Sequence, residues 1–291
     1  MLLQTDGSEH KWLEDRGPYL SLVGAIDDAT GKVAGALFRE EEDSYGYFSL
    51  FREIVARYGI PHAVYHDRHS IFQTSPKKPW SLEEQLEGKR KPTQFGRLLE
   101  ELGITSIASL SPQAKGRVER LWGTFQDRLV SELRLAGASS LEEANKVLKD
   151  FLPRYNRHFA VAAAEPGSAY RQVKEGFVPN EVFCFKHQRI VGADNVVRFG
   201  KHRLQIVPCH GRSSYARCRV EVHERLDGSL AVYYQGKPLI TGLTRPEPAV
   251  LRAQAKVLEP VIAAATPPVV CHHKPTPDHP WRLWVYRANK E

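Results

Sequence analysis

The sequence predicts a mixed α/β domain followed by a small all-β domain. Three observations support this prediction: the order of apolar segments up to about residue 170, the short β-prone segments after residue 180, and an uneven distribution of charge. The 291 residues are 42% hydrophobic and 26% charged, which is typical of a globular protein and not of a disordered or collagen-like chain. No apolar run approaches the roughly 20 residues that a membrane helix needs. No secretory signal pattern opens the chain, and four cysteines are too few for a disulfide scaffold, so we expect a reducing cytoplasm.

The first 70 residues predict three antiparallel strands, a helix and a fourth strand. The three strands are joined by turns, of which Asp27 to Gly31 is the clearest. The helix follows from aromatic and aliphatic residues at helical spacing, and Gly59 to Pro61 ends it. The expected strands cover residues 2–6, 19–26, 33–38 and 62–67, and the helix covers residues 47–58.

Residues 73–92 are polar and broken by three prolines, which predicts an inserted excursion. Beyond it we expect a helix over 93–102, a strand over 104–110, and a long helix after Ser111-Pro112. An apolar stripe from Val118 to Leu133 marks the buried face of that helix. A last helix runs from Ser139-Ser140 towards Tyr155-Asn156. This order predicts a mixed sheet flanked by helices.

Proline and glycine residues between 166 and 179 predict a domain boundary. We therefore expect a core over 1–170, a linker over 171–180, a small β-barrel over 181–245 and an irregular, proline-rich tail over 246–291. Residues 1–170 carry 22 basic and 24 acidic side chains, whereas residues 171–291 carry 19 basic and 10 acidic ones. The surplus positive charge lies in the second part, which favours a polyanionic partner there.

Three acidic residues occur at related points of the predicted order. Asp6 lies in or at the end of the first strand, Asp67 ends the fourth, and Glu119 lies early on the long helix. Carboxylates on separate strands and a helix can converge on Mg²⁺, which prefers oxygen ligands. Asp27 is an alternative first acid, although a β-turn explains it well. Taken singly, each carboxylate is better explained by a turn, a cap or a solvated surface, and only the three together favour a metal site.

Several motifs resemble those of the retroviral-integrase-like DDE transposases. Ser111 to Arg120 (SPQAKGRVER) resembles the SPxxxGxxER stretch that carries the third acid of that family. The segments around Asp6, Asp67 and Tyr155-Asn156 are similar to its first strand, second acid and last core helix. Within the family the chain most resembles ISNCY-type bacterial insertion-sequence transposases, whose closing HPW appears as His279-Pro280-Trp281.

The resemblance implies an RNase H-like core followed by an SH3-like barrel. It also implies that Asp6, Asp67 and Glu119 are catalytic and bind two Mg²⁺ or Mn²⁺ ions. The implied reaction is DNA strand cleavage followed by strand transfer, on transposon ends and target DNA. The implied partner is DNA, which a homo-oligomer would bind. The implied location is the bacterial cytoplasm, in association with the nucleoid and not with a membrane.

Two features depart from the family pattern. Asp67 and Glu119 are separated by 51 residues, more than the 35 of the retroviral pattern, and residues 73–92 account for the excess. The first strand begins at about residue 2, so we expect a form that lacks the N-terminal helix-turn-helix region. Two other functions stay open: a catalytically silent DNA-binding or assembly protein, and another nuclease with this fold.

Basic residues provide candidate DNA contacts in both parts of the chain. One group flanks the second and third acids, where phosphate groups would approach the ions. The other group interleaves with the predicted barrel strands, where it would bind DNA or support assembly. The first group is Arg68, Lys115, Arg117 and Arg120, together with Gly116, which permits close approach of the backbone. The second group is Lys186, Arg189, Lys201 and Arg203.

Overall fold

A five-stranded mixed sheet forms the centre of the first part of the chain, in the order β3-β2-β1-β4-β5. The computed structural model describes residues 1–75, 77–109, 116–165, 167–208 and 212–243. The strands are antiparallel from β1 to β3, and β4 and β5 run parallel to β1. They span β1 (Leu2–His10), β2 (Leu20–Asp27), β3 (Val33–Arg39), β4 (Ala63–His66) and β5 (Thr105–Ala108).

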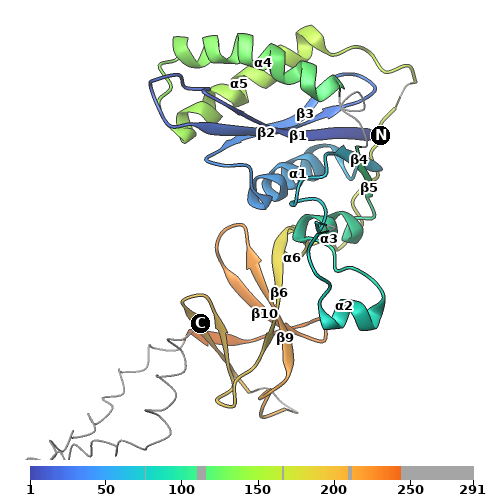
Figure 1. Cartoon of the computed structure of the whole chain (residues 1–291), viewed down its shortest axis with the longest axis vertical. Coiled ribbons are helices and arrows are strands. Elements are labelled where there is room, and N and C mark those ends of the chain that lie inside the picture. The colour runs from blue at the N-terminus through green and yellow to red at the C-terminus, as the bar shows by residue number, and fades with distance from the viewer. Residues whose placement is uncertain (76, 110–115, 166, 209–211, 244–291) are drawn as a thin grey trace, which may run out of the picture. The chain divides into compact units, whose positions relative to one another are not determined.

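Helices cover both faces of this sheet (Figure 1). One face packs against α1 (Ser44–Tyr58) and α3 (Gln94–Glu101), with Phe48, Phe51 and Phe95 fully buried between them. The other face packs against α4 (Gly116–Leu135) and α5 (Leu141–Phe159). All eight residues of β2 are buried because both of its faces are covered. The predicted mixed α/β class is therefore confirmed, and so is the apolar stripe of α4, which is buried from Val118 to Leu133.

The first strand is longer than the sequence predicted. It continues beyond Asp6 to His10, because β2 pairs with it along its whole length, from Leu3 opposite Asp27 to His10 opposite Leu20. Asp6 consequently lies within β1 and not at its end. After His10 the chain turns, and Trp12 and Leu13 are fully buried against the α4 and α5 side of the sheet.

The excursion predicted over residues 73–92 contains one short helix, α2 (Leu82–Glu87). Ser81 and Glu84 form a capping box at its start, in which each side chain binds the other residue's backbone N–H. Gly88 adopts φ = 62° at the end of the helix, a left-handed conformation that favours glycine. Residues 77–91 are called the basic loop below.

The second part of the chain is all-β after a short helix, α6 (Pro179–Val182). One sheet has the order β11-β10-β9-β6 and the other has the order β12-β8-β7. A shared core buries Val197, Leu204, Ile206, Val222 and Val232. The strands span β6 (Cys184–Ile190), β7 (Val196–Phe199), β8 (His202–Ile206), β9 (Arg219–Arg225), β10 (Leu230–Tyr234), β11 (Lys237–Leu239) and β12 (Thr241–Leu243).

The sequence predicts five strands here, over residues 182–190, 196–199, 202–207, 216–222 and 230–234. Four of them begin within two residues of their observed starts, and β9 begins later than expected. It starts at Arg219 and not at Ala216, because Arg217 adopts φ = 62°, a left-handed conformation outside the regular β region. Met1–Thr244 form one compact unit. The division at residues 171–180 stays a prediction, and the tail predicted over 246–291 lies outside the described residues.

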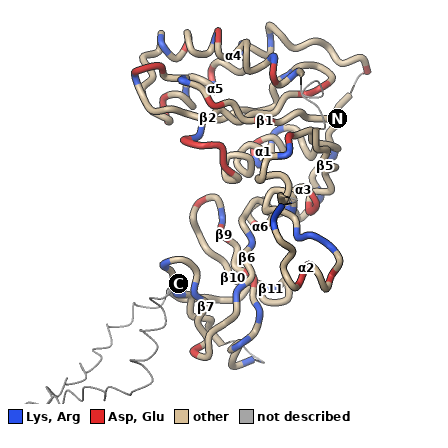
Figure 2. Tube along the Cα trace, in the orientation of Figure 1, with Lys and Arg blue, Asp and Glu red and all other residues tan. Residues whose placement is uncertain are grey.

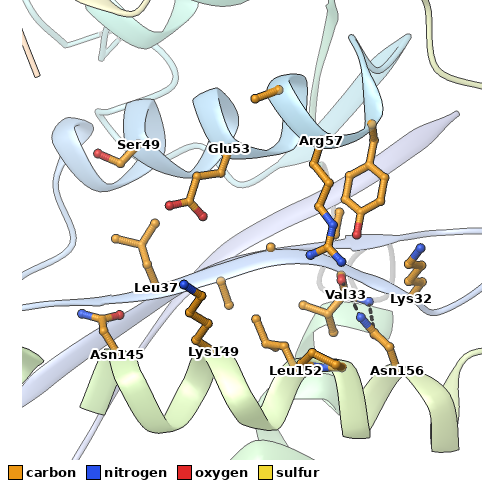
Figure 3. Close-up of a pocket in the computed structure, with 16 residues that line it drawn as sticks. Lys32, Val33, Leu37, Ser49, Glu53, Arg57, Asn145, Lys149, Leu152 and Asn156 are labelled. Carbon is orange, nitrogen blue, oxygen red and sulfur yellow. Dashed lines mark hydrogen bonds between the residues drawn. The ribbon is translucent and has the colours of Figure 1, made fainter. Parts of the chain in front are cut away.

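Two asparagines of α5 pair with the outer edge of β3. Asn156 accepts from the Val33 N–H over 2.8 Å and donates to its carbonyl over 2.9 Å. Asn145 makes the same two bonds with Phe38, at 2.8 and 3.1 Å. The two amides replace part of a missing neighbouring strand. They border a cavity of about 930 Å³ between α1 and α5, which Figure 3 shows.

We predict that Asn156→Ala lowers the free energy of unfolding by about 1–2 kcal/mol, because the backbone groups of the buried Val33 lose their partner. Urea titration followed by circular dichroism measures this loss. Lys146→Ala, an exposed change on the same helix, is the control and should stay within about 0.5 kcal/mol of wild type. Equal stabilities of the two variants would contradict the prediction.

Candidate active site

The parallel pairing of β1 with β4 brings two of the predicted acids together. Leu3 stands opposite Val64 and Gln4 opposite Tyr65. Continuing this register by two residues brings Asp6 opposite Asp67, the residue that follows β4. Side chains alternate between the faces of a strand, so Asp6 lies on the same face of β1 as Gln4, whereas Asp67 lies in the turn that follows β4. Both residues are partly buried.

Each aspartate is held by a neighbouring donor. The indole Nε1 of Trp122 on α4 donates to Asp6 Oδ2 over 3.4 Å. The backbone N–H of His69 donates to Asp67 Oδ1 over 2.8 Å, within the turn that follows β4. The helical spacing of the apolar stripe from Val118 to Leu133 predicts only that Trp122 is a core residue. It is indeed 6% exposed, but its N–H also fixes one of the candidate acids.

His66 fixes the backbone immediately before Asp67. Its ring is fully buried and stacks on Phe72, with centroids 4.4 Å apart. Nδ1 lies 2.5 Å from the Asp67 carbonyl and Nε2 lies 2.7 Å from Ser106 Oγ. A carbonyl can only accept, so Nδ1 carries the proton and Nε2 accepts from the Ser106 hydroxyl. This arrangement ties the end of β4 to β5.

Glu119 lies in the first turn of α4 and its side chain is exposed. Contacts with β1 occur on both sides of it along the helix. The Val118 N–H donates to Gln4 Oε1 over 3.2 Å, and Gln126 Nε2 donates to Ser8 Oγ over 3.4 Å. Glu119 and Gln126 are seven residues apart and so lie on one stripe of the helix. Glu119 is therefore on the edge of α4 that borders the polar face of β1.

A fourth acid, which the sequence did not single out, lies near the aspartates. Glu42 follows β3, and the buried Tyr47 hydroxyl donates to its Oε1 over 2.5 Å. Its carboxylate packs over Gly7, where any Cβ atom would overlap it. Burial raises the pKa of Glu42, the Tyr47 hydrogen bond and His69 lower it, and the charges of Asp6 and Asp67 raise it further. Glu40, Glu41 and Glu42 are consecutive, so no sequence signal distinguishes the last one.

The candidate acids provide the oxygen donors that Mg²⁺ and Mn²⁺ prefer, and the two aspartates are in register. In the described ranges, no three His, Cys, Asp or Glu side chains already form a group that could hold a metal ion. The donor chemistry of the three carboxylates suits a divalent ion, but the described structure does not bring them together into a site for one.

Asp27, the alternative first acid, is engaged in its own turn. Its Oδ1 accepts from the Ala29 N–H over 2.9 Å, and its Oδ2 accepts from the Thr30 hydroxyl over 2.5 Å. Gly31, at φ = 68°, donates to the Asp27 carbonyl over 2.9 Å. Both carboxylate oxygens therefore stabilise the β-turn between β2 and β3.

The predicted basic contacts differ in their availability. Arg68 and Arg120 are exposed, Arg117 pairs with Asp28 at 3.3 Å, and Lys115 lies outside the described residues. Gly116 is the first residue of α4, and its carbonyl accepts from Arg120 Nε over 3.0 Å. In the all-β part, Arg189 and Lys201 are exposed, Arg203 is partly buried, and the Lys186 ammonium binds both Glu101 oxygens, at 2.8 and 3.0 Å.

Two curated proteins are similar to this chain over most of its length. One is the Sinorhizobium fredii protein y4bF, named as a transposase, which is 38% identical over 241 residues, or 82% of this chain and 51% of the relative. The other is the transposase for insertion sequence IS1202 of Streptococcus pneumoniae, which is 31% identical over 231 residues, or 79% of this chain and 48% of the relative. The chain spans about half the length of both. No family model matches it.

The chain is a relative of two bacterial transposases.

Solved structures with some likeness come from retroviruses. A chain of the simian T-cell lymphotropic virus intasome in complex with PP2A regulatory subunit B56 gamma matches 84% of this chain, with 79% of that chain covered, 14% identity and a TM-score of 0.38. The HTLV-2 integrase catalytic core domain in complex with magnesium matches 50% of this chain, with 81% of that chain covered, 18% identity and a TM-score of 0.34. No helix in the described part of this transposase relative could cross a membrane.

We predict that Glu42→Gln stabilises this transposase relative at pH 7 and that the gain shrinks as the pH falls towards about 4. The folded-state pKa of Glu42 is raised, so the native state binds more protons than the unfolded state between the two pKa values. Stability is lost as the pH rises through that window, and glutamine removes this loss. Urea unfolding at both pH values measures it. Glu41→Gln, an exposed neighbour, should show no such dependence.

Proposed function

We propose that the chain carries the catalytic part of a DDE-type DNA transposase, which cleaves a DNA strand and transfers it to target DNA. The observation that supports the proposal is the parallel register of β1 and β4, which would bring Asp67 opposite Asp6 if it continued for two residues, together with the contact between the first turn of α4 and Gln4 of β1. The similarity to transposases of two bacteria supports the same function.

Asp6, Asp67 and Glu119 would bind two Mg²⁺ or Mn²⁺ ions. Such ions activate the attacking oxygen and stabilise the leaving oxygen of an in-line displacement at phosphorus. The chain itself orients the donors: Trp122 holds one oxygen of Asp6, and the His69 N–H holds one oxygen of Asp67. Glu42 and Tyr47 support this end of the sheet from its other face.

Positive groups beside the acids would position the DNA backbone. Arg68 follows Asp67 directly, and Gly116, Arg117 and Arg120 share the first two turns of α4 with Glu119. Lys115 precedes them in sequence. Arg189, Lys201 and Arg203 of the all-β part would add contacts to DNA or to a second copy in a homo-oligomer. Lys186 is held by Glu101 and so would contribute to packing against α3.

We expect the purified chain to nick supercoiled plasmid DNA with Mg²⁺ or Mn²⁺ and not with EDTA. Asp6→Asn and Asp67→Asn should each lower the rate at least about 100-fold, because even the loss of an outer partner of a metal ligand costs 10- to 100-fold. Asp127→Asn, an exposed change on α4, is the control and should cut like wild type. Equal rates for wild type and Asp67→Asn would refute the proposed mechanism.

Divalent ion binding gives a second test that does not depend on substrate. A ligand that binds only the native state stabilises it by about 2.7 kcal/mol at 100 times its Kd. We expect Mg²⁺ to raise the melting temperature of wild type and of Asp127→Asn but not of an Asp6→Asn/Asp67→Asn variant. A catalytically silent DNA-binding relative that has lost the ion site would show no Mg²⁺ effect in any of them.

A further inference from the structure

The basic loop carries a surplus of positive charge close in sequence to Asp67. Its fifteen residues contain five basic side chains and three acidic ones, Glu83, Glu84 and Glu87. Figure 2 shows the basic residues on the arms of the loop that flank α2. The cations are Lys77, Lys78, Lys89, Arg90 and Lys91.

Two of the three acids are used within the structure. Glu84 is buried, and its carboxylate accepts from the backbone N–H groups of Ser81 and Lys91, at 2.8 and 3.0 Å. These bonds lower the pKa of Glu84 to about 2, so it is ionised but directed inwards. Glu83 pairs with Lys91 and, at 3.2 Å, with Arg219 of β9. The loop therefore presents more positive charge to solvent than its composition suggests.

Local bonds bring the remaining cations together. Arg90 Nη2 donates to the Lys78 carbonyl over 2.5 Å, which joins the two arms of the loop. The Arg90 guanidinium also lies 5.0 Å from the centre of the Trp80 ring. Lys77, Lys78 and Lys89 are exposed, and their side chains make no hydrogen bond or ion pair in the described part of the chain.

A rigid neck attaches the loop beside the candidate acids. The neck consists of Ile71, Phe72 and Thr93: the Thr93 hydroxyl contacts the Ile71 carbonyl at 2.7 Å and the Phe72 carbonyl at 3.2 Å. Phe72 is 4% exposed, and its ring stacks on His66, the residue before Asp67. The direction in which the loop leaves the core is thus fixed by the packing that also fixes Asp67.

We propose that the basic loop binds the phosphate backbone of duplex DNA through Lys77, Lys78 and Lys89. This inference rests on the proposed function and names one surface by which the DNA is held. The charge of the loop complements the polyanion, and three unpaired ammonium groups can each displace a counterion from a phosphate. Trp80, Leu82 and Leu86 are 42%, 72% and 80% exposed, which is too small an apolar surface to explain the loop as a protein interface.

The test measures binding of the full chain to a fluorescent duplex oligonucleotide of random sequence by anisotropy, over a series of salt concentrations. Changing Lys77, Lys78 and Lys89 together to alanine should weaken binding roughly 10- to 100-fold at 0.1 M salt. The slope of log K against log salt should fall by about 2.7, because each lost phosphate contact removes about 0.9. The same three positions changed to arginine should bind like wild type, because the charge is kept.

Lys11, Lys146 and Lys174 changed together to alanine provide the matched control, since they are three exposed lysines elsewhere in the chain. Circular dichroism melting shows whether each variant is folded. If the loop variant kept the wild-type affinity and slope, the inference would fail while the nicking assay still tested the proposed function. If the control variant lost as much as the loop variant, the effect would be net charge and the inference would also fail.

Two further outcomes separate this inference from its alternatives. If wild type bound no duplex even at low salt, both the inference and the proposed function would fail. The last variant changes Leu82 and Leu86 to serine. If it dissociated an oligomer in sedimentation while the three lysine changes left DNA affinity unaltered, the loop would be an interface between copies of the chain, and the inference would be wrong.

Discussion

The parallel pairing of β1 with β4 is the constraint on which the rest of the site depends. Leu3 and Val64 are fully buried partners in this pairing, so a slip by one residue would turn an apolar side chain out of the core. The same slip would separate Asp6 from Asp67 across the sheet. The core therefore fixes the register, and the register fixes the acids. α4 then packs on the polar face of β1 through Gln4, Asp6 and Ser8.

This arrangement concentrates negative charge at one end of the sheet. Burial raises the pKa of the partly buried Glu42 carboxylate, and repulsion from Asp6 and Asp67 raises it further. Glu42 still accepts from Tyr47, whose own hydroxyl pKa is raised, chiefly by burial, so it remains a donor. A bound cation would relieve the repulsion.

Local patterns predicted the fold well, whereas tertiary contacts decided the parts that were missed. The helical spacing from Val118 to Leu133 identified the buried face of α4, because burial follows that period directly. Asp6 and Asp67 could be chosen among 34 acids only through motifs. Glu42 could not be chosen from the sequence, because Glu41 precedes it directly and is also an acid. Only the turn between β3 and α1 places the Glu42 side chain, and not that of Glu41, over Gly7. The pairing of Asn145 and Asn156 with β3 likewise joins residues more than 100 positions apart.

In the described part of the chain, three lysines stay unpaired within one short segment, from His66 to Thr93, because most of its acidic side chains bind other groups. The Asp67 carboxylate accepts from the backbone N–H of His69. In the basic loop, the Glu84 carboxylate accepts from the Lys91 backbone N–H, and Glu83 pairs with Lys91 and Arg219. If Lys77, Lys78 and Lys89 were paired with those carboxylates, their charges would be neutralised and would attract a polyanion less strongly. Phe72 joins both ends, since its ring packs on His66 while its carbonyl accepts from Thr93. A phosphate backbone held by the loop would therefore be held at a fixed place relative to Asp67, which is what a reaction at one phosphorus atom requires.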